Sequence, residues 1–153
     1  MPTTFNHIGL TVTDLERSTS FYRLLGFDER GPMRLELKNQ DWLAPIVGIP
    51  GVDMIVSYLS FGPTTLELLQ YVNPQGGQRT PLDVNDSGSA HIGLEVDDLH
   101  AEYDRLVAAG VEFKSPPVTI PYGDHVFGGV VSVYGYDPDG NCFELQSFPK
   151  PRS

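Results

Sequence analysis

Two histidines stand at matching places in the two halves of the chain. His7 opens the segment His-Ile-Gly-Leu-Thr-Val-Thr-Asp-Leu, and His91 opens His-Ile-Gly-Leu-Glu-Val-Asp-Asp-Leu, at an offset of 84 residues. Each half also carries a glutamate among large apolar residues, Glu67 in Leu-Glu-Leu-Leu and Glu144 in Phe-Glu-Leu. A carboxylate in such surroundings is costly unless it is paired or bound to a cation.

Together these side chains have the composition of a metal site. Two imidazoles and two carboxylates suit one divalent transition metal and leave positions open for water or substrate. The charge of the two glutamates balances that of the ion. The sequence therefore predicts a site with these ligands: His7, Glu67, His91 and Glu144.

The segments around the histidines predict strands that lead into helices. Residues 5–12 and 90–96 alternate polar and apolar side chains, which indicates a strand with one apolar face. Helices are expected at 15–25 and about 98–109, each with an aspartate at its start and a glycine at its end. The apolar rows should face the helices, so both histidines should point to the opposite side of the sheet.

The rest of each half favours three further strands. They are expected at 33–38, 52–61 and 64–71 in the first half, with a loop over 39–50, and near 111–114, 130–136 and 142–148 in the second, with a loop before 130. Proline, glycine and polar residues over 73–89 indicate a linker. We expect an α+β fold in one domain, 1–153, built from two βαβββ modules, 5–72 and 90–148. Their sheets would form a curved, incompletely closed mixed sheet around a groove.

Composition limits the partners. The chain has 153 residues and a net charge of −10, which argues against binding to nucleic acid. Cys142 is the single cysteine, so no intrachain disulfide is possible, and a small buried side chain is expected there. No apolar run reaches 18 residues, and the N-terminus lacks the pattern of a signal peptide. These features favour a cytoplasmic protein without membrane contact, whose partner is a small molecule.

Other side chains have weaker claims to a site. Trp42, Tyr58 and Tyr134 could equally form substrate walls or belong to the core. His125 lies in a loop and could be a lid residue or proton shuttle, or simply a surface residue. The turn at 137–140, Asp-Pro-Asp-Gly, is expected to carry solvated acids rather than catalytic ones.

Several motifs resemble the vicinal oxygen chelate superfamily over nearly the whole chain. They are His-Ile-Gly-Leu…Asp-Leu…Phe-Tyr…Leu-Gly-Phe, then Leu-Glu-Leu-Leu, then His-Ile-Gly-Leu-Glu-Val-Asp-Asp, then Asp-Pro-Asp-Gly-Asn-Cys-Phe-Glu-Leu. That group includes glyoxalase I, methylmalonyl-CoA epimerase, extradiol dioxygenases and antibiotic-resistance proteins. The resemblance implies paired βαβββ modules around a metal site, in a homodimer.

By the same resemblance, the four predicted ligands match the His-Glu-His-Glu set of glyoxalase I. Two substrate determinants of the relatives are missing. The stretch 49–52, Ile-Pro-Gly-Val, lacks the acid that epimerases carry before a Gly-Val, and the first strand lacks the arginine that helps glyoxalase I hold glutathione.

Three functional hypotheses follow. The first is a metal-dependent lyase or isomerase of glyoxalase or epimerase type. It would use one ion of Zn, Ni, Co, Mn or Fe to polarise the carbonyl of a small chelating substrate, with Glu144 or Glu67 moving the neighbouring proton. The second is an Fe(II) or Mn(II) ring-cleaving dioxygenase in which one glutamate is not a ligand. The third is a non-catalytic small-molecule binding protein of resistance type. The site could form within one chain or across two.

Overall fold

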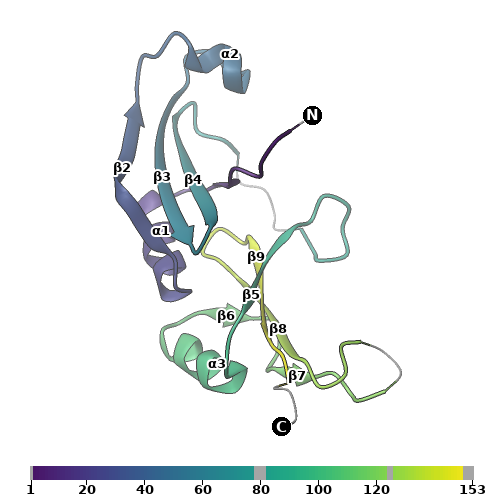
Figure 1. The fold of residues 1–153 in the computed structure, drawn as a ribbon. Coiled ribbons are helices and arrows are strands. Elements are labelled where there is room, and N and C mark those ends of the chain that lie inside the picture. Colours follow the sequence, from purple (N-terminus) through teal and green to yellow (C-terminus); the bar gives the residue numbers. More distant parts are fainter. Residues whose placement is uncertain (1, 78–81, 124–125, 150–153) are drawn as a thin grey trace. The chain divides into compact units, whose positions relative to one another are not determined.

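The chain folds into two compact units. The computed structural model describes residues 2–77, 82–123 and 126–149. The units comprise residues 1–79 and 80–153, and Figure 1 shows the helices and strands of each. The boundary between them lies inside the segment 73–89 that the sequence marks as a linker.

The described part of the first unit contains a four-stranded sheet in the order β1-β4-β3-β2. Its elements along the chain are β1 (Ile8–Thr11), α1 (Leu15–Leu24), β2 (Asp28–Leu37), α2 (Leu43–Val47), β3 (Asp53–Phe61) and β4 (Thr64–Asn73). β1 runs parallel to β4, whereas the β2–β3 and β3–β4 pairs are antiparallel. The sheet is therefore mixed, with the parallel strand at one edge.

One face of this sheet is covered by α1. The helix contacts β3 and β4, and the strand residues on that face, Leu59, Leu66 and Leu68, are fully buried. Within the helix, Leu15 and Tyr22 are 2% exposed. Burial of this apolar surface is the main force that holds helix and sheet together.

The other face of the first sheet carries α2, where the sequence predicts a loop over 39–50. The prediction was wrong because Leu43 has an apolar cluster to join. Leu43 is buried with Val52, Met54 and Val56, and α2 ends at Gly48 in a left-handed conformation. A single turn of helix has no clear sequence periodicity, so only the burial of Leu43 against the strands reveals it.

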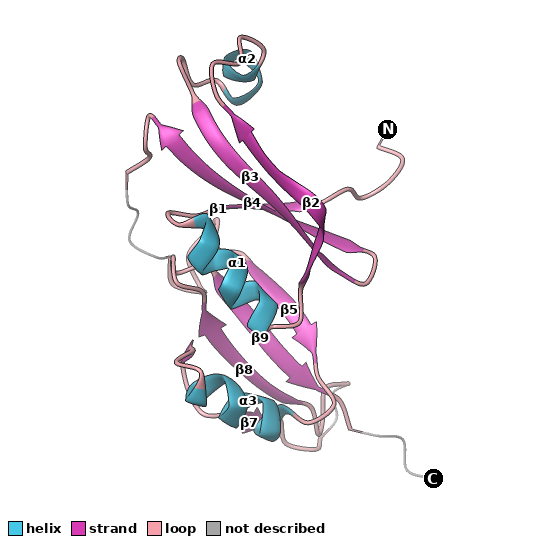
Figure 2. Ribbon diagram, turned by 90° about the vertical axis from the view of Figure 1, so that its left-hand side faces the viewer, coloured by secondary structure: helices cyan, strands magenta, loops and turns pink. Residues whose placement is uncertain are grey.

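In the described part of the second unit the sheet has five strands, with a path β5-β9-β8-β6 and β7 paired to β8. Its elements are β5 (His91–Glu95), α3 (Leu99–Ala108), β6 (Glu112–Phe113), β7 (Val118–Thr119), β8 (Val131–Tyr136) and β9 (Cys142–Ser147). β5 is parallel to β9, and the remaining pairs are antiparallel. α3 lies beside this sheet (Figure 2) and contacts β9. Its residues Leu99 and Leu106 are buried.

The predicted pair of βαβββ modules is confirmed, with small differences. β7 lies in a segment expected to be a loop, because Val118 and Thr119 pair with Ser132 and Val131 at the sheet edge. Two residues are too few to show the alternation of a strand in the sequence.

The two helix entries repeat each other closely. Asp14 caps α1 by accepting a hydrogen bond from the Arg17 backbone N–H, and Asp98 caps α3 by accepting one from Ala101. Gly26 and Gly110 follow the helices with φ of 92° and 86°, a left-handed conformation that favours glycine. These positions confirm the helix starts and ends predicted from the sequence. Among the described residues, no helix has the length and apolar character needed to cross a membrane.

Candidate metal centre

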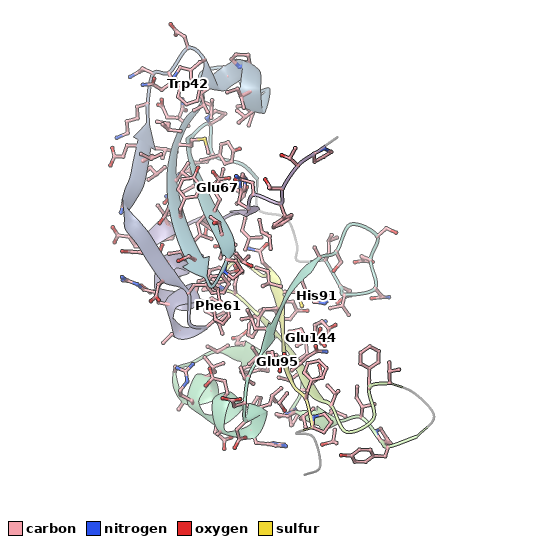
Figure 3. The ribbon with its side chains drawn as sticks, viewed as in Figure 1. Trp42, Phe61, Glu67, His91, Glu95 and Glu144 are labelled. Carbon is pink, nitrogen blue, oxygen red and sulfur yellow. The ribbon has the colours of Figure 1, made fainter. Side chains whose placement is uncertain are left out.

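In the first unit, His7 and Glu67 form a pair on the face opposite α1. Parallel pairing places Gly9 beside Glu67, so His7, two residues earlier and just before β1, reaches the same carboxylate. His7 Nε2 lies 3.2 Å from Glu67 Oε2, and the glutamate side chain is only 14% exposed. The two residues that the sequence linked to one module are therefore in contact, and Figure 3 shows Glu67 in the middle of its sheet.

The tautomer of His7 makes this contact informative. Its Nδ1 lies 2.7 Å from Asn6 Oδ1, an oxygen that accepts the Nδ1 proton. A neutral imidazole with its proton on Nδ1 presents the Nε2 lone pair to Glu67 Oε2. Two electron-rich atoms that face each other need a cation or a proton between them. Metal-ligating histidines have this arrangement, in which the second ring nitrogen donates to a neighbouring acceptor.

The second unit contains the same pair. His91 is the first residue of β5 and Glu144 lies in β9, with His91 Nε2 at 3.3 Å from Glu144 Oε2 and a glutamate exposure of 13%. Figure 3 shows both side chains on this unit. Hydrogen bonds from Ser132 Oγ at 2.6 Å and Gln146 Nε2 at 2.9 Å end on the other oxygen, Glu144 Oε1. The carboxylate is thereby oriented with Oε2 towards the imidazole.

The N···O separation within each pair can be compared with the spacing of two atoms that ligate the same ion. Nitrogen and oxygen ligands lie about 2.0–2.2 Å from a zinc ion. At tetrahedral or octahedral angles, two such ligand atoms are about 3.0–3.4 Å from each other. Charge-assisted N–H···O hydrogen bonds are shorter, about 2.7–2.9 Å. The observed 3.2 and 3.3 Å therefore match a pair of metal ligands better than a direct ion pair. In the described segments, no third His, Cys, Asp or Glu joins either pair.

A tyrosine stands directly across the sheet from each glutamate. Tyr58 pairs with Glu67 and donates a hydrogen bond of 2.6 Å to its Oε1, and this bond, helped by burial, raises the pKa of Tyr58 to about 12. Tyr134 pairs with Glu144, and burial followed by the charge of Glu144 raises its pKa. The Tyr134 ring also lies edge-on to His91 with centroids 5.1 Å apart. Of the three predicted substrate-wall residues, Tyr58 and Tyr134 thus contact the proposed ligands themselves.

The glycine two residues after each histidine faces the carboxylate. Gly9 is paired with Glu67 and Gly93 with Glu144. A Cβ atom at Gly9 would lie 3.6 Å from Glu67 Oε2, whereas one at Gly93 would meet nothing within 4 Å. A side chain at position 9 would therefore project beside the Glu67 carboxylate, whereas at position 93 there is open space.

The remaining candidates fall outside the two pairs. Trp42 is 51% exposed beside α2, and its Nε1 donates to Gln40 Oε1 at 3.0 Å (Figure 3). His125 lies outside the described residues. Cys142 is buried as expected, and this burial raises its pKa.

The expectation that the acids of the turn at 137–140 are solvated was wrong for Asp137. It is 4% exposed, and its carboxylate accepts hydrogen bonds from the backbone N–H groups of Asp139 and Asn141 and from Asn141 Nδ2. The carboxylate is bound within the turn instead of to water, because it accepts hydrogen bonds from N–H groups that would otherwise be left unpaired in the buried turn.

Sequence reasoning missed the partners of the proposed ligands. Asn6 precedes His7, and Gln146 shares a strand face with Glu144, so both had a local signal in the spacing. Ser132 had none, because its contact with Glu144 depends on the register between β8 and β9.

The sequence matches a known family. Residues 4–145 match the Glyoxalase/Bleomycin resistance protein/Dioxygenase superfamily, and the chain belongs to this family. The vicinal oxygen chelate resemblance is thereby confirmed. No curated protein matched the sequence.

Solved structures share the fold. A glyoxalase family protein from Bacillus cereus superposes with a TM-score of 0.81 at 16% identity and covers 97% of this chain and 95% of its own. The fosfomycin resistance protein FosX from Listeria monocytogenes, complexed with Mn(II) and sulfate, gives a TM-score of 0.62 at 18% identity, with 98% and 96% covered. A glyoxalase family protein from Enterococcus faecalis gives 0.63 at 19% identity, with 94% and 96% covered.

Proposed function

We propose that the chain is a metal-dependent lyase or isomerase that moves a proton next to the carbonyl of a small chelating substrate. Its two histidine–glutamate pairs would bind one divalent ion. The observation that carries the proposal is the duplicated contact, with N···O separations of 3.2 Å in one unit and 3.3 Å in the other. Both modules of the repeat thus hold an imidazole nitrogen and a carboxylate oxygen at a separation that suits two ligands of one ion.

The donor set limits the metal. Imidazole nitrogen and carboxylate oxygen suit zinc, nickel, cobalt, manganese or iron, and the two carboxylates neutralise a dication. When bound, the ion would supply Lewis-acid polarisation of the substrate carbonyl. FosX, which shares the fold, was crystallised with Mn(II).

The chain's own residues would hold the ion, orient its ligands and accept the substrate's proton. The imidazoles of His7 and His91 would each offer the Nε2 lone pair to the ion. Asn6 Oδ1 accepts the Nδ1 proton of His7 and so favours the tautomer with a free Nε2. Glu67 or Glu144 accepts the proton next to the carbonyl, since a carboxylate beside the reacting carbon is a competent base. Each glutamate is mostly buried, which keeps bulk water away from the carboxylate that accepts the proton. The lack of a side chain at Gly9 leaves space for the substrate beside Glu67.

Metal binding is the first test. Purified protein should take up one divalent ion per chain, measured by elemental analysis after dialysis. The variants His7→Ala and Glu144→Ala should each lower this to below a tenth. A matched change far from both pairs, His100→Ala on α3, should leave it intact. Wild-type protein without stoichiometric metal, and unaffected by both site changes, would refute the proposal.

The reaction is tested by isotope exchange. The metal-loaded protein should transfer solvent deuterium to the carbon next to the carbonyl in a member of a panel of α-hydroxy and α-keto compounds, followed by NMR. Metal binding without exchange on any compound would contradict the enzyme and favour a binding protein. Oxygen consumption with catechols would instead identify a dioxygenase.

A further inference from the structure

Residues 39–51, in the connection between β2 and β3, form a strap that includes α2 (Figure 1). All of these residues are described, and Leu43 alone among them is buried. It packs in a small apolar cluster with three other buried residues, Val52, Met54 and Val56. The neighbouring Trp42 and Ile46 are 51% and 71% exposed. Leu43 is therefore the central contact between the strap and the sheet.

The ends of the strap are tied by side chains of the neighbouring strands. The Asn39 backbone N–H donates to Asp53 Oδ1 at 2.8 Å, and Asn73 Nδ2 donates to the Gly51 carbonyl oxygen at 3.1 Å. Asn39 and Gly51 have φ of 53° and 66°, left-handed values that turn the chain sharply at both ends. Small apolar clusters beneath loops open at a lower free energy than the main core. We therefore expect the strap to lift before the sheet unfolds.

The cluster beneath the strap extends to Glu67. Tyr58 and Leu69 are partly buried and pack against the cluster. Tyr58 also donates the 2.6 Å hydrogen bond to Glu67 Oε1. A Cβ atom at Gly9 would lie 3.4 Å from Leu69 Cδ1 and 3.6 Å from Glu67 Oε2, so Leu69 lies near the oxygen that faces His7. The residues that pack on the cluster thus border both oxygens of the carboxylate.

The second unit holds its carboxylate by other means. Ser132 and Gln146 pair across β8 and β9 as Val56 and Leu69 pair across β3 and β4. Both donate hydrogen bonds to Glu144 Oε1. The connection between β6 and β8 carries no helix in its described part. Hydrogen bonds from two neighbours therefore orient the carboxylate of the second unit, whereas apolar packing beneath α2 stands at the same positions in the first.

We infer that Leu43 is a positioning residue for the metal pair of the first unit and acts through Tyr58. Leu43 holds α2 on the cluster, and the cluster supports the Tyr58 ring. Tyr58 in turn holds Glu67 Oε1, so that Oε2 faces His7. The inference rests on the proposed function and names the element that regulates this half of its site. When the strap lifts, the tyrosine ring gains room and its hydrogen bond to Glu67 weakens.

The link from Leu43 to Tyr58 is tested first in the metal-free protein by NMR. Tyrosines are labelled with 13C at Cζ, and the Tyr58 signal is assigned by its loss in Tyr58→Phe. Leu43→Ala should move this signal towards that of free tyrosine, because the hydrogen bond weakens. Leu43→Met, which conserves the volume, should restore its position. The signal of Tyr134, in the other unit, should stay in place.

Two further variants complete this experiment. Ile46→Ala, a truncation on the exposed side of α2, is the matched control and should leave the Tyr58 signal unchanged. Leu43→Val, a smaller truncation, should shift the signal in the same direction as Leu43→Ala and serves if the larger one unfolds. A Tyr58 signal that does not move in a folded Leu43 truncation would refute the inference.

Affinity for Mn(II), measured by calorimetry, gives the second readout. Leu43→Ala and Tyr58→Phe should each weaken binding by about 10-fold, the lower end of the loss seen when a partner of a metal ligand is removed. The double variant should bind no more weakly than Tyr58→Phe, because both changes act through the same hydrogen bond. Losses that multiply in the double variant would show that Leu43 does not act through Tyr58. Ile46→Ala should keep the wild-type affinity.

The inference and the proposed function fail in different ways. Wild-type protein that binds no divalent ion refutes the proposed function, and the NMR comparison still tests whether Leu43 positions Tyr58. Wild-type protein that binds the ion, with a Tyr58 signal and an Mn(II) affinity that do not respond to Leu43→Ala, refutes the inference and leaves the proposed function standing.

Discussion

At the residue scale, the two oxygens of each glutamate have different partners. Glu67 and Glu144 are 14% and 13% exposed, yet each keeps one oxygen directed at an imidazole nitrogen. The other oxygen is satisfied by neutral hydroxyl, phenol or amide groups. No positively charged side chain is needed beside either glutamate, which leaves the negative charge of the pair available for a cation.

Asp137 should contribute strongly to stability. Its buried carboxylate accepts three hydrogen bonds within the turn. Asp137→Ala leaves these donors without an acceptor and should lower the free energy of unfolding by about 2–4 kcal/mol, measured by urea denaturation. Asp104→Ala, at an exposed position of α3, should change it by less than about 0.5 kcal/mol. Similar values for the two variants would disprove the structural role.

Cys142 should react slowly in the folded protein. Burial raises its pKa, so the fraction of reactive thiolate at neutral pH falls. The residue is 8% exposed. The rate with a disulfide reagent, followed by absorbance, should be at least about tenfold below that of the chain unfolded in guanidinium. Equal rates in the folded and unfolded protein would show that the thiol is open to solvent.

At the element scale, each site pair is made by a parallel edge strand and its neighbour. His7 directly precedes β1 and His91 begins β5, while β4 and β9 carry the glutamates, in equivalent registers. The helices α1 and α3 bury the opposite faces and so fix which side of each strand points to the site. A shift of one residue in either register would turn the glutamate to the helix side.

Gly135 should be needed for packing in the second sheet. A Cβ there would lie 2.4 Å from Phe143 Cζ and 2.9 Å from the Glu112 carbonyl oxygen. Gly135→Ala should therefore lower the free energy of unfolding by about 1–3 kcal/mol, as overpacking does. Gly93→Ala is the matched change in the same sheet, with nothing within 4 Å of the new carbon, and should cost less than about 0.5 kcal/mol in thermal or urea unfolding. A larger effect at Gly93 would contradict the packing argument.

At the scale of the whole molecule, each unit of the repeat carries one histidine–glutamate pair, and the family places the chain among proteins that include metalloenzymes. The chain divides into units of similar size, each with its own sheet and helix. The net charge of −10 favours capture of a cation over an anionic partner.

Metal should stabilise the whole molecule through both units at once. If one ion uses ligands from each half, metal at about 100 times its dissociation constant should add about 2.7 kcal/mol to stability, measured by denaturation with and without chelator. His7→Ala or His91→Ala alone should then remove most of this gain and leave no ion bound. A stoichiometry of two ions in wild type, with one remaining in either variant, would show instead that each unit binds its own.

The repeat, the order of strands and helices apart from α2 and β7, and the assignment of one histidine and one glutamate to each module could be predicted from the sequence alone. Those features depend on local patterning, since alternation and capping act over a few residues. Three features needed the folded structure: the oxygen of Glu67 that faces His7, the hydrogen bonds of Ser132 and Gln146 to Glu144, and the formation of α2 and β7. Each of these depends on strand register or on burial against residues distant in the chain, and neither the register nor the partner of a buried side chain is encoded by the neighbouring residues alone.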